Sequence, residues 1–403
     1  MATLVLLTAS YPLGGVAEPS FVGPEIEALA SEFDRVIVAP MLDRGPQLPL
    51  PANVCLDRSL LRRPSALDKA RSLFRPETWR RLYEDRRYIH SPGKFRNALA
   101  FTAYVFYCRR VLRRLIERYS LDLGDTLFYT FWFDCQVASL SGIDGAKTIT
   151  RAHGYDVYDE RNNFLSHSWR RSSLARLAAC FAVSDDGVRY MRGDYPQFAS
   201  KIQLRLLGSA ENTRLNPPAS DGAVTFVSVA RVSPEKRVWL LAECLVYWAG
   251  LDPARRVRWI HVGDGPDMER VRRCVASAPE NLEVELLGSL PNAEVHELFA
   301  TRHADFSALL SLSERLPIAA CESLSYGVPM VAASVGGLPE IITDEVGVPL
   351  SPDPSPEEFA RRMDEALPRL GQLREAARRR WEESYNARPL RLAFAREIRR
   401  LLQ

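Results

Sequence analysis

The sequence predicts an α/β protein built of two doubly wound domains, and three observations support this fold class. Short apolar runs alternate with amphipathic stretches along nearly the whole chain, which is typical of βα units around a parallel sheet. The length of 403 residues exceeds what a single hydrophobic core usually supports. A polar stretch rich in turn formers interrupts the alternation at 212–222. We therefore expect an N-terminal domain over 1–211, a linker over 212–222 and a C-terminal domain over 223–387.

The first domain is expected to contain five strands and an early helix. The strands are Leu4–Leu7, Val36–Ala39, Leu127–Thr130, Thr148–Thr150 and Phe181–Val183. A turn-rich loop follows the first strand, and a helix is then expected from Pro24 to Phe33. Proline suits the first position of a helix, and acidic side chains such as Glu25 favour its first turn.

The second domain repeats this pattern. Its expected strands are Val224–Val229, Val257–Val262, Val284–Leu287, Phe306–Leu310 and Met330–Ala332, and its helices include Leu240–Trp248, Asp267–Val275 and Ala293–Phe299. The last stretch, 388–403, carries apolar residues at helical spacing. We expect it to form an amphipathic helix that packs back on the first domain.

The composition is that of an ordinary globular protein, with 46% hydrophobic and 26% charged residues and a net charge of +3. It excludes a disordered, collagen-like or disulfide-framed chain and argues against a nucleic-acid coat. The seven cysteines are odd in number and widely spaced, which indicates reduced thiols in a cytoplasmic protein. No histidine pair has ligand spacing, so no metal is expected. Apolar runs are too short to span a bilayer, so we expect a soluble protein.

The balanced total charge hides a basic segment at 58–118. This segment contains 17 Lys or Arg and five Asp or Glu, a net charge of +12, which leaves −9 on the rest of the chain. Aromatic residues are interleaved with these charges. One interpretation is a surface for anionic lipid at the inner face of the cell membrane, and another is a solvated helix surface. RNA binding is disfavoured because no recognition module accompanies the charge.

The most informative motif places two glutamates eight positions apart. Glu314 precedes Pro317, which suits the first position of a helix that ends before Gly327. At such a helix start, free N–H groups can hold an anion or sugar hydroxyls. Glu322 lies on the helix among apolar neighbours, so its carboxylate is expected to be partly buried. The two hydroxyls of a ribose would satisfy it, although a capping role or an arginine partner would do so too.

Together with the downstream G-x-P and G-G-x-P-E segments, this pattern resembles the nucleotide-sugar site of glycosyltransferase family 4. The resemblance implies the GT-B architecture of two Rossmann-like domains. The stretch 228–236 resembles the family's donor-domain loop, in which an Arg and a Lys bind the donor diphosphate, and these correspond to Arg231 and Lys236. Gly263 matches a strand-to-helix turn near the base. The implied donor site also includes Arg315, Leu316, Pro317 and Glu322, with Glu314 positioning the sugar.

Two motifs of the first domain extend the resemblance. Gly14 and Gly15 match a glycine-rich loop that approaches phosphate, and a tight turn alone is the alternative. His153, followed by glycine at a strand end, matches a residue that faces the donor sugar or the acceptor, although a structural histidine remains an alternative. The stretch 11–29 resembles members that build bacterial surface polysaccharides. Arg315 departs from the family, which usually has glycine there, and this leaves the donor sugar open.

The resemblance therefore implies a retaining, metal-independent glycosyltransferase without a cofactor. It would transfer a sugar from a nucleoside-diphosphate sugar to a glycan or lipid-linked oligosaccharide, in a cytoplasmic or peripheral membrane location and without nucleic-acid partners. Arg231, Lys236, Glu314 and His153 would be catalytic. Another GT-B enzyme, such as a small-molecule glycosyltransferase or a sugar-nucleotide epimerase, is an alternative. A non-catalytic scaffold that binds nucleotide or glycan is another.

Overall fold

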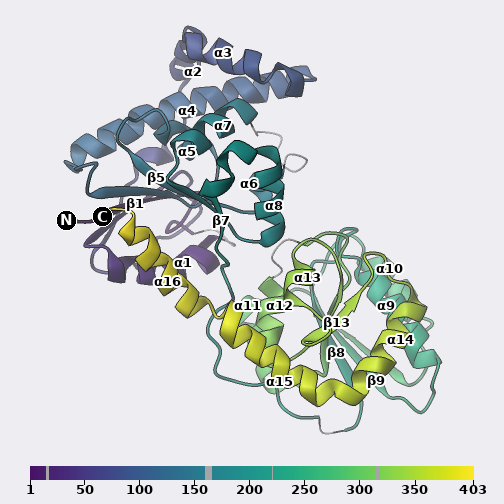
Figure 1. The fold of residues 1–403 in the computed structure, drawn as a ribbon. Helices are drawn as coiled ribbons and strands as arrows, with labels where there is room; N and C mark the ends of the chain where they lie inside the picture. The colour runs from purple at the N-terminus through teal and green to yellow at the C-terminus, as the bar shows by residue number, and fades with distance from the viewer. Residues whose placement is uncertain (15–17, 159–165, 220, 315–317) are drawn as a thin grey trace. The chain divides into compact units, whose positions relative to one another are not determined.

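A computed structural model of the chain describes residues 1–14, 18–158, 166–219, 221–314 and 318–403 (Figure 1). It divides into two compact units, each with its own parallel sheet. Unit 1 comprises Met1–Leu207 and Pro389–Gln403, and unit 2 comprises Gly208–Arg388. These two sheets confirm the predicted fold class.

The sheet of unit 1 has the strand order β3-β2-β1-β4-β5-β6-β7, with parallel pairing throughout. The strands are β1 (Thr3–Thr8), β2 (Arg35–Pro40), β3 (Val54–Leu56), β4 (Thr126–Thr130), β5 (Lys147–Ala152), β6 (Ala179–Ala182) and β7 (Ile202–Leu204). The chain winds outward in both directions from β1 and β4. Open sheets of this kind bind ligands at the carboxyl ends of the strands beside such a reversal.

Helices cover both faces of this sheet because successive residues of a strand point to opposite faces. Leu4 and Leu6 of β1 share one apolar core with α1 (Glu18–Glu32) and α16 (Ala387–Arg400). Val5 and Leu7 share another with α4 (Pro92–Arg118). On the far side of α4 from the sheet lie α2 (Ala66–Leu73) and α3 (Pro76–Glu84) (Figure 1). The other helices are α5 (Cys135–Leu140), α6 (Gly154–Val157), α7 (His167–Arg176) and α8 (Asp185–Asp194).

Helix α1 begins earlier than predicted, at Glu18, so that Pro24 lies inside it and does not start it. A proline lacks an N–H, so its presence normally marks a helix boundary. Here the Glu18 carboxylate accepts hydrogen bonds from the amides of Ala9, Ser10 and Tyr11. These bonds tie the first turn of the helix to the end of β1, which the local sequence does not reveal.

The sheet of unit 2 has the order β10-β9-β8-β11-β12-β13, again fully parallel. The strands are β8 (Val224–Val229), β9 (Val257–Val262), β10 (Leu282–Leu286), β11 (Phe306–Leu309), β12 (Met330–Ala333) and β13 (Gly347–Leu350). The helices are α9 (Val238–Gly250), α10 (Met268–Val275), α11 (Asn292–Thr301), α12 (Ile318–Ser325), α13 (Leu338–Ile341), α14 (Pro356–Ala366) and α15 (Leu370–Arg380). The reversal lies between β8 and β11.

The segment predicted as a linker is bonded to unit 2. The Asn216 side chain donates to the carbonyls of Phe299 and Arg302 and accepts from the amide of Ala304. The division between the units falls at Leu207 and Gly208. Near the end of the chain, α16 passes into unit 1, where Glu397 forms an ion pair with Arg205.

A buried charge cluster joins α1, β4, β5 and α16 in unit 1. The Arg151 guanidinium lies 2.9 Å from the Glu25 carboxylate, and both side chains are only 1% exposed. Its Nε donates to the Tyr129 hydroxyl at 2.7 Å, and that hydroxyl donates to Glu25 at 2.8 Å. The Phe394 ring of α16 lies under the guanidinium at 4.1 Å. The terminal helix is therefore held to the sheet by both apolar contact and charge.

We expect Glu25→Gln to lower the free energy of unfolding by about 3–5 kcal/mol, because it leaves the Arg151 charge buried without its partner. The matched control is Asp144→Asn, which breaks the exposed pair of Asp144 with Arg176 and should change stability little. Urea unfolding followed by circular dichroism measures both. Equal shifts for the two variants would contradict the structural importance of the buried pair.

Candidate functional site

An ion pair lies at the carboxyl edge of the unit 2 sheet. The Lys236 ammonium, in the loop after β8, contacts the Glu314 carboxylate in the loop after β11. Glu314 is buried and also accepts a hydrogen bond from the Ser311 hydroxyl at 2.7 Å. Lys236 keeps 27% of its side chain exposed. Two predicted site residues that are far apart in the sequence thus come together, with the lysine facing solvent.

Arg237, which the sequence analysis did not single out, fixes the loops that carry this pair. It is buried, adopts a left-handed conformation with φ of 47° and starts α9. Its guanidinium donates to the carbonyls of Leu310, Ser311 and Pro352 at 2.7, 3.2 and 2.7 Å. It also lies 2.8 Å from the Asp353 carboxylate. The sequence shows that Arg237 directly follows Lys236, which is the one signal that could have found it. The burial of Arg237, however, depends on loops that are distant in sequence.

The G-G-x-P-E motif supports the backbone of Glu314. Gly336 has φ of +53°, and a Cβ there would lie 1.5 Å from the Glu314 carbonyl oxygen. The Gly337 amide donates to the same oxygen at 3.0 Å. A side chain at Gly336 would therefore displace the loop that carries Glu314.

The predicted turn at Gly263 is packed directly on the loop after β8. A Cβ at Gly263 would lie 1.8 Å from the Ala230 carbonyl oxygen, which only a glycine avoids. The Val232 amide donates to the carbonyl of Asp264 at 3.0 Å, and the Gly263 amide donates to Gly288 at 2.8 Å. These contacts hold three neighbouring loops together. Close packing is therefore the reason that position 263 requires a glycine.

Behind this turn, His261 is buried and uncharged. Burial lowers its pKa to about 4. The Ser228 hydroxyl accepts from the Trp259 indole at 2.9 Å and lies 2.7 Å from the Nδ1 of His261. The hydroxyl therefore donates to Nδ1 and leaves the ring proton on Nε2. Among the described residues, Nε2 has no hydrogen-bond partner.

The other predicted donor-site residues of unit 2 are arranged separately. Arg231 is exposed, and within the described part of the chain it forms no hydrogen bond or ion pair. Glu322, on α12, is partly buried as predicted and faces α11. Its Oε1 lies 3.5 Å from Asn292 Nδ2 and 3.6 Å from His296 Nε2. Arg315, Leu316 and Pro317 lie outside the described residues.

In unit 1, His153 follows β5 and starts α6. Its ring packs against Trp132 and Phe131, with ring centroids 4.4 and 4.8 Å apart. Both ring nitrogens are buried and lack a hydrogen-bond partner in the part of the chain that the structure describes. Nδ1 lies 3.8 Å from the Asp156 carboxylate. The structure thus leaves the hydrogen-bonding capacity of both buried ring nitrogens unused by the described residues.

The predicted glycine loop of unit 1 is described only in part. Gly14 pairs with Arg44 in an isolated bridge, and Gly15 lies outside the described residues. The carboxylate of Glu18, which the sequence analysis did not select, organises this region. Besides the amides at the end of β1, it accepts from the Trp132 indole at 2.8 Å. Glu18 thereby links the loop to the aromatic ring that packs on His153.

Comparisons with known proteins identify what this fold and its edge loops resemble. Residues 210–383 match the family model described as Glycosyl transferases group 1. Two solved structures resemble the chain in fold. Lipopolysaccharide outer core galactosyltransferase WaaB in apo form shares 13% identity and covers 98% of this chain and 99% of its own, with a TM-score of 0.64. HepE of Anabaena in complex with UDP shares 16% identity and covers 99% of each chain, with a TM-score of 0.61.

The chain thus has the GT-B fold, and its second unit is similar to the family of group 1 glycosyl transferases. Among curated proteins, a phosphatidylinositol N-acetylglucosaminyltransferase component of Arabidopsis thaliana is 29% identical over 265 residues. The alignment covers 64% of this chain and 56% of that relative, so the chain spans about half of that relative's length.

We expect the buried His261 to make unit 2 less stable in acid. Its folded pKa of about 4 lies below the ordinary value of 6.5, so the unfolded chain binds the proton first as the pH falls. Above pH 6.5, the neutral imidazole does not lower the free energy of unfolding. As the pH falls towards 4, this free energy decreases by about 3 kcal/mol.

The measurement is urea unfolding of the wild type and of His261→Gln between neutral pH and pH 4. The variant keeps an acceptor for Ser228 but cannot titrate, so the difference between the two proteins should change with pH in favour of the variant. A difference that stays constant across this range would rule out a buried neutral imidazole.

Proposed function

We propose that the protein is a retaining, metal-independent glycosyltransferase that uses a nucleoside-diphosphate sugar. It transfers the sugar to a glycan or lipid-linked oligosaccharide in bacterial surface polysaccharide biosynthesis. The observation that carries the proposal is the solvent-facing Lys236 paired with the buried Glu314 on a loop that Arg237 holds. HepE, which shares the fold, is described in complex with UDP. The curated relative is named for N-acetylglucosaminyl transfer to phosphatidylinositol.

The chemistry of donor cleavage fits the charges at this edge. When the glycosidic bond breaks, negative charge develops on the leaving diphosphate, and fixed cations lower the energy of that state. Lys236 and the exposed Arg231 supply two positive charges on one loop after β8. In the proposed reaction they neutralise the diphosphate without a metal ion. Retention of configuration follows from the family resemblance.

Two carboxylates serve different parts of the donor in this proposal. Glu314 is a hydrogen-bond acceptor at the loop edge and positions the sugar hydroxyls. Glu322 accepts from the ribose hydroxyls, and Asn292 and His296 orient its carboxylate from α11. His153, with free ring nitrogens on unit 1, contacts the acceptor or the transferred sugar.

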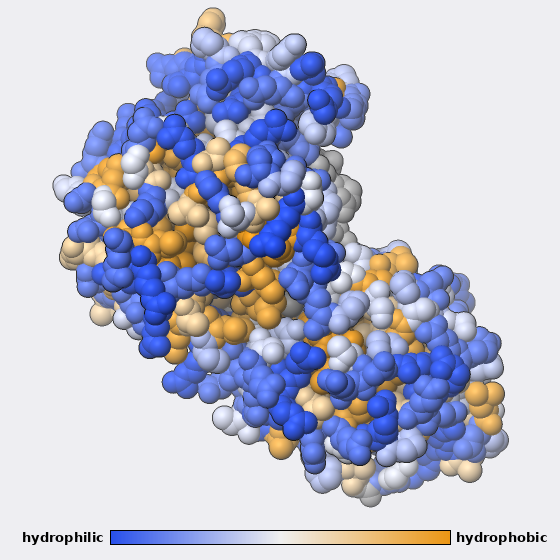
Figure 2. Space-filling view, viewed as in Figure 1, coloured by the Kyte–Doolittle hydropathy of each residue, from blue (hydrophilic) through white to orange (hydrophobic). Residues whose placement is uncertain are grey.

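A lipid-linked acceptor is supported by the surface of α2 and α3. Exposed apolar or aromatic side chains are concentrated there, and they include Leu67, Leu73, Phe74, Trp79 and Tyr83. Hydrophilic side chains predominate on the face of the α2 and α3 region that Figure 2 shows. Some arginines of the basic segment are structural, since Arg81 and Arg109 are largely buried against Trp169. Others, such as Arg80 and Arg87, are exposed and face solvent. No helix in the described ranges is both long and apolar enough to cross a membrane.

We expect Lys236→Ala to lower the rate of sugar transfer by about 10²–10³-fold, because it removes a cation from the leaving diphosphate. The matched control is Arg256→Ala, which removes an exposed cation at the amino edge of the same sheet and should leave transfer unchanged. Product formation from a panel of nucleotide sugars measures the effect. Near-normal turnover of Lys236→Ala would refute the site, and nucleotide binding without turnover in the wild type would favour the scaffold.

We expect the protein to sediment with phosphatidylcholine vesicles only when they contain phosphatidylglycerol, and less so at high salt. Each basic residue near an anionic bilayer contributes about 1 kcal/mol, so Arg80→Glu with Arg87→Glu should weaken binding by about thirtyfold or more. The control is Arg272→Glu with Arg273→Glu on α10, which should bind normally. Binding that does not depend on lipid charge, or an equal loss of binding in both double variants, would contradict a membrane surface on α3 and the turn that follows it.

A further inference from the structure

A cavity of about 260 Å³ lies in unit 1 beside the carboxyl ends of β2, β4 and β5. Apolar and aromatic side chains dominate its lining, among them Met41, Phe101, Tyr104, Phe133, Ala138 and Trp169. All of its lining residues belong to unit 1, and the roles proposed above leave it unused. A lining that is mostly apolar favours ligands with an apolar part.

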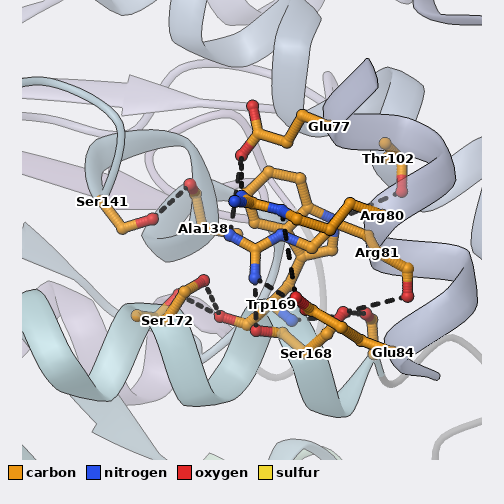
Figure 3. A network of polar contacts seen from close by, with 12 residues as sticks. Glu77, Arg80, Arg81, Glu84, Thr102, Ala138, Ser141, Ser168, Trp169 and Ser172 are labelled. Atoms are coloured by element: carbon orange, nitrogen blue, oxygen red, sulfur yellow. Dashed lines mark hydrogen bonds and ion pairs between the residues drawn. The ribbon is translucent and has the colours of Figure 1, made fainter. Parts of the chain in front are cut away.

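The cavity wall is preformed by a polar network behind Trp169 (Figure 3). The Trp169 indole donates to the Thr102 hydroxyl at 3.2 Å, which fixes the plane of the ring. On its outer side, the Arg81 guanidinium of α3 lies 4.3 Å from the ring centroid. Arg81 is itself paired with Glu77 and Glu84. A ligand would therefore enter a site whose shape is already set.

One carboxyl group lines this apolar space. Asp134 caps α5 by accepting from the Gln136 amide at 2.9 Å. Burial, together with the nearby Asp156 and Glu18, raises the pKa of Asp134 to about 7. Near neutrality this group can donate or accept a hydrogen bond. Ser166, Arg170 and Ser173 also line the cavity, so it combines a mostly apolar body with a few polar groups, as ligand sites commonly do.

Size and surroundings favour a hydrocarbon chain as the occupant. A cavity of about 150 Å³ accommodates benzene, so this one has room for a larger apolar group. Helix α3, with its exposed Trp79 and Tyr83, packs against α4 and α7, which wall the cavity. The chain would come from a lipid at the surface formed by α2 and α3.

We propose that the cavity binds the first part of the hydrocarbon chain of a lipid-linked acceptor, with Asp134 bonded to a polar group next to that chain. This inference rests on the proposed function for the identity of the acceptor, but chain binding itself needs no donor. The site would select acceptors that carry a hydrocarbon tail over free sugars.

The test uses a series of alkyl β-glucosides from methyl to octyl, titrated calorimetrically into the full-length protein below micelle concentrations. Affinity should rise about fourfold for each added methylene until the chain fills the cavity. Affinity that does not change with chain length would overturn the proposal.

Two substitutions on α4 locate the binding. Ala100→Phe puts a ring into the cavity lining and should lower octyl glucoside affinity at least tenfold. Ala98→Phe adds the same ring to the same helix, at a half-buried position outside the lining, and should bind normally. Phe101→Ala enlarges the cavity and should extend the chain length at which affinity stops rising. Equal losses for Ala98→Phe and Ala100→Phe would place the chain elsewhere.

Failure of this inference and failure of the proposed function give different results. UDP binding, measured on the same proteins by thermal shift, should be unaffected by Ala100→Phe, because UDP belongs to the proposed site on unit 2. If octyl glucoside binds as expected but no nucleotide sugar is turned over, the cavity stands and the transferase proposal falls. If transfer to sugars without a tail proceeds and chain length has no effect, the cavity proposal falls.

Discussion

The buried guanidinium of Arg237 is the constraint on which the site of unit 2 depends. A buried charge without partners is costly, so its acceptors are held in place together. Those acceptors lie in the loop after β11 and in the segment after β13, while Arg237 itself ends the loop after β8. The same loops carry Lys236 and Glu314, so the ion pair of the site is built on an interaction beneath it. Gly336 packs directly against the carbonyl group of Glu314, so the Glu314 backbone cannot move towards it.

Unit 1 uses buried charge in a similar way. The Glu18 carboxylate accepts hydrogen bonds from backbone amides at the end of β1 and from the indole of Trp132. The buried pair of Arg151 and Glu25 joins the terminal helix to the sheet.

The arginines of the basic segment 58–118 have two different uses. Arg81 and Arg109 stack on Trp169 and stabilise the helices, whereas Arg80 is exposed and pairs within α3, with Glu77 and Glu84. The net charge of the segment can be counted from the sequence, but the count does not distinguish buried, structural arginines from exposed ones.

Apolar periodicity was sufficient to predict the central strands, and β8 and β9 have the predicted bounds. The short strands β3, β7 and β13 were not predicted, since three or four residues at the sheet edges give too weak a pattern. In the site, the family resemblance selected Lys236 and Glu314, but their contact depends on β8 and β11 being neighbours. Arg237 and Asp134 were missed for the same reason. Their surroundings come from segments distant in sequence, and no local pattern records burial of that kind.

The pairing of Lys236 with Glu314 also restricts the kind of ligand that suits this edge. A purely anionic ligand would draw the lysine away and leave a buried carboxylate without a cation. A neutral polyol would satisfy Glu314 but leave the lysine no new partner. A ligand that carries both a diphosphate and sugar hydroxyls offers each group a partner at the same time, and the charge of the pair is then balanced within one complex. Nucleotide sugars have this combination, so the electrostatics of the site favour the donor class that we propose.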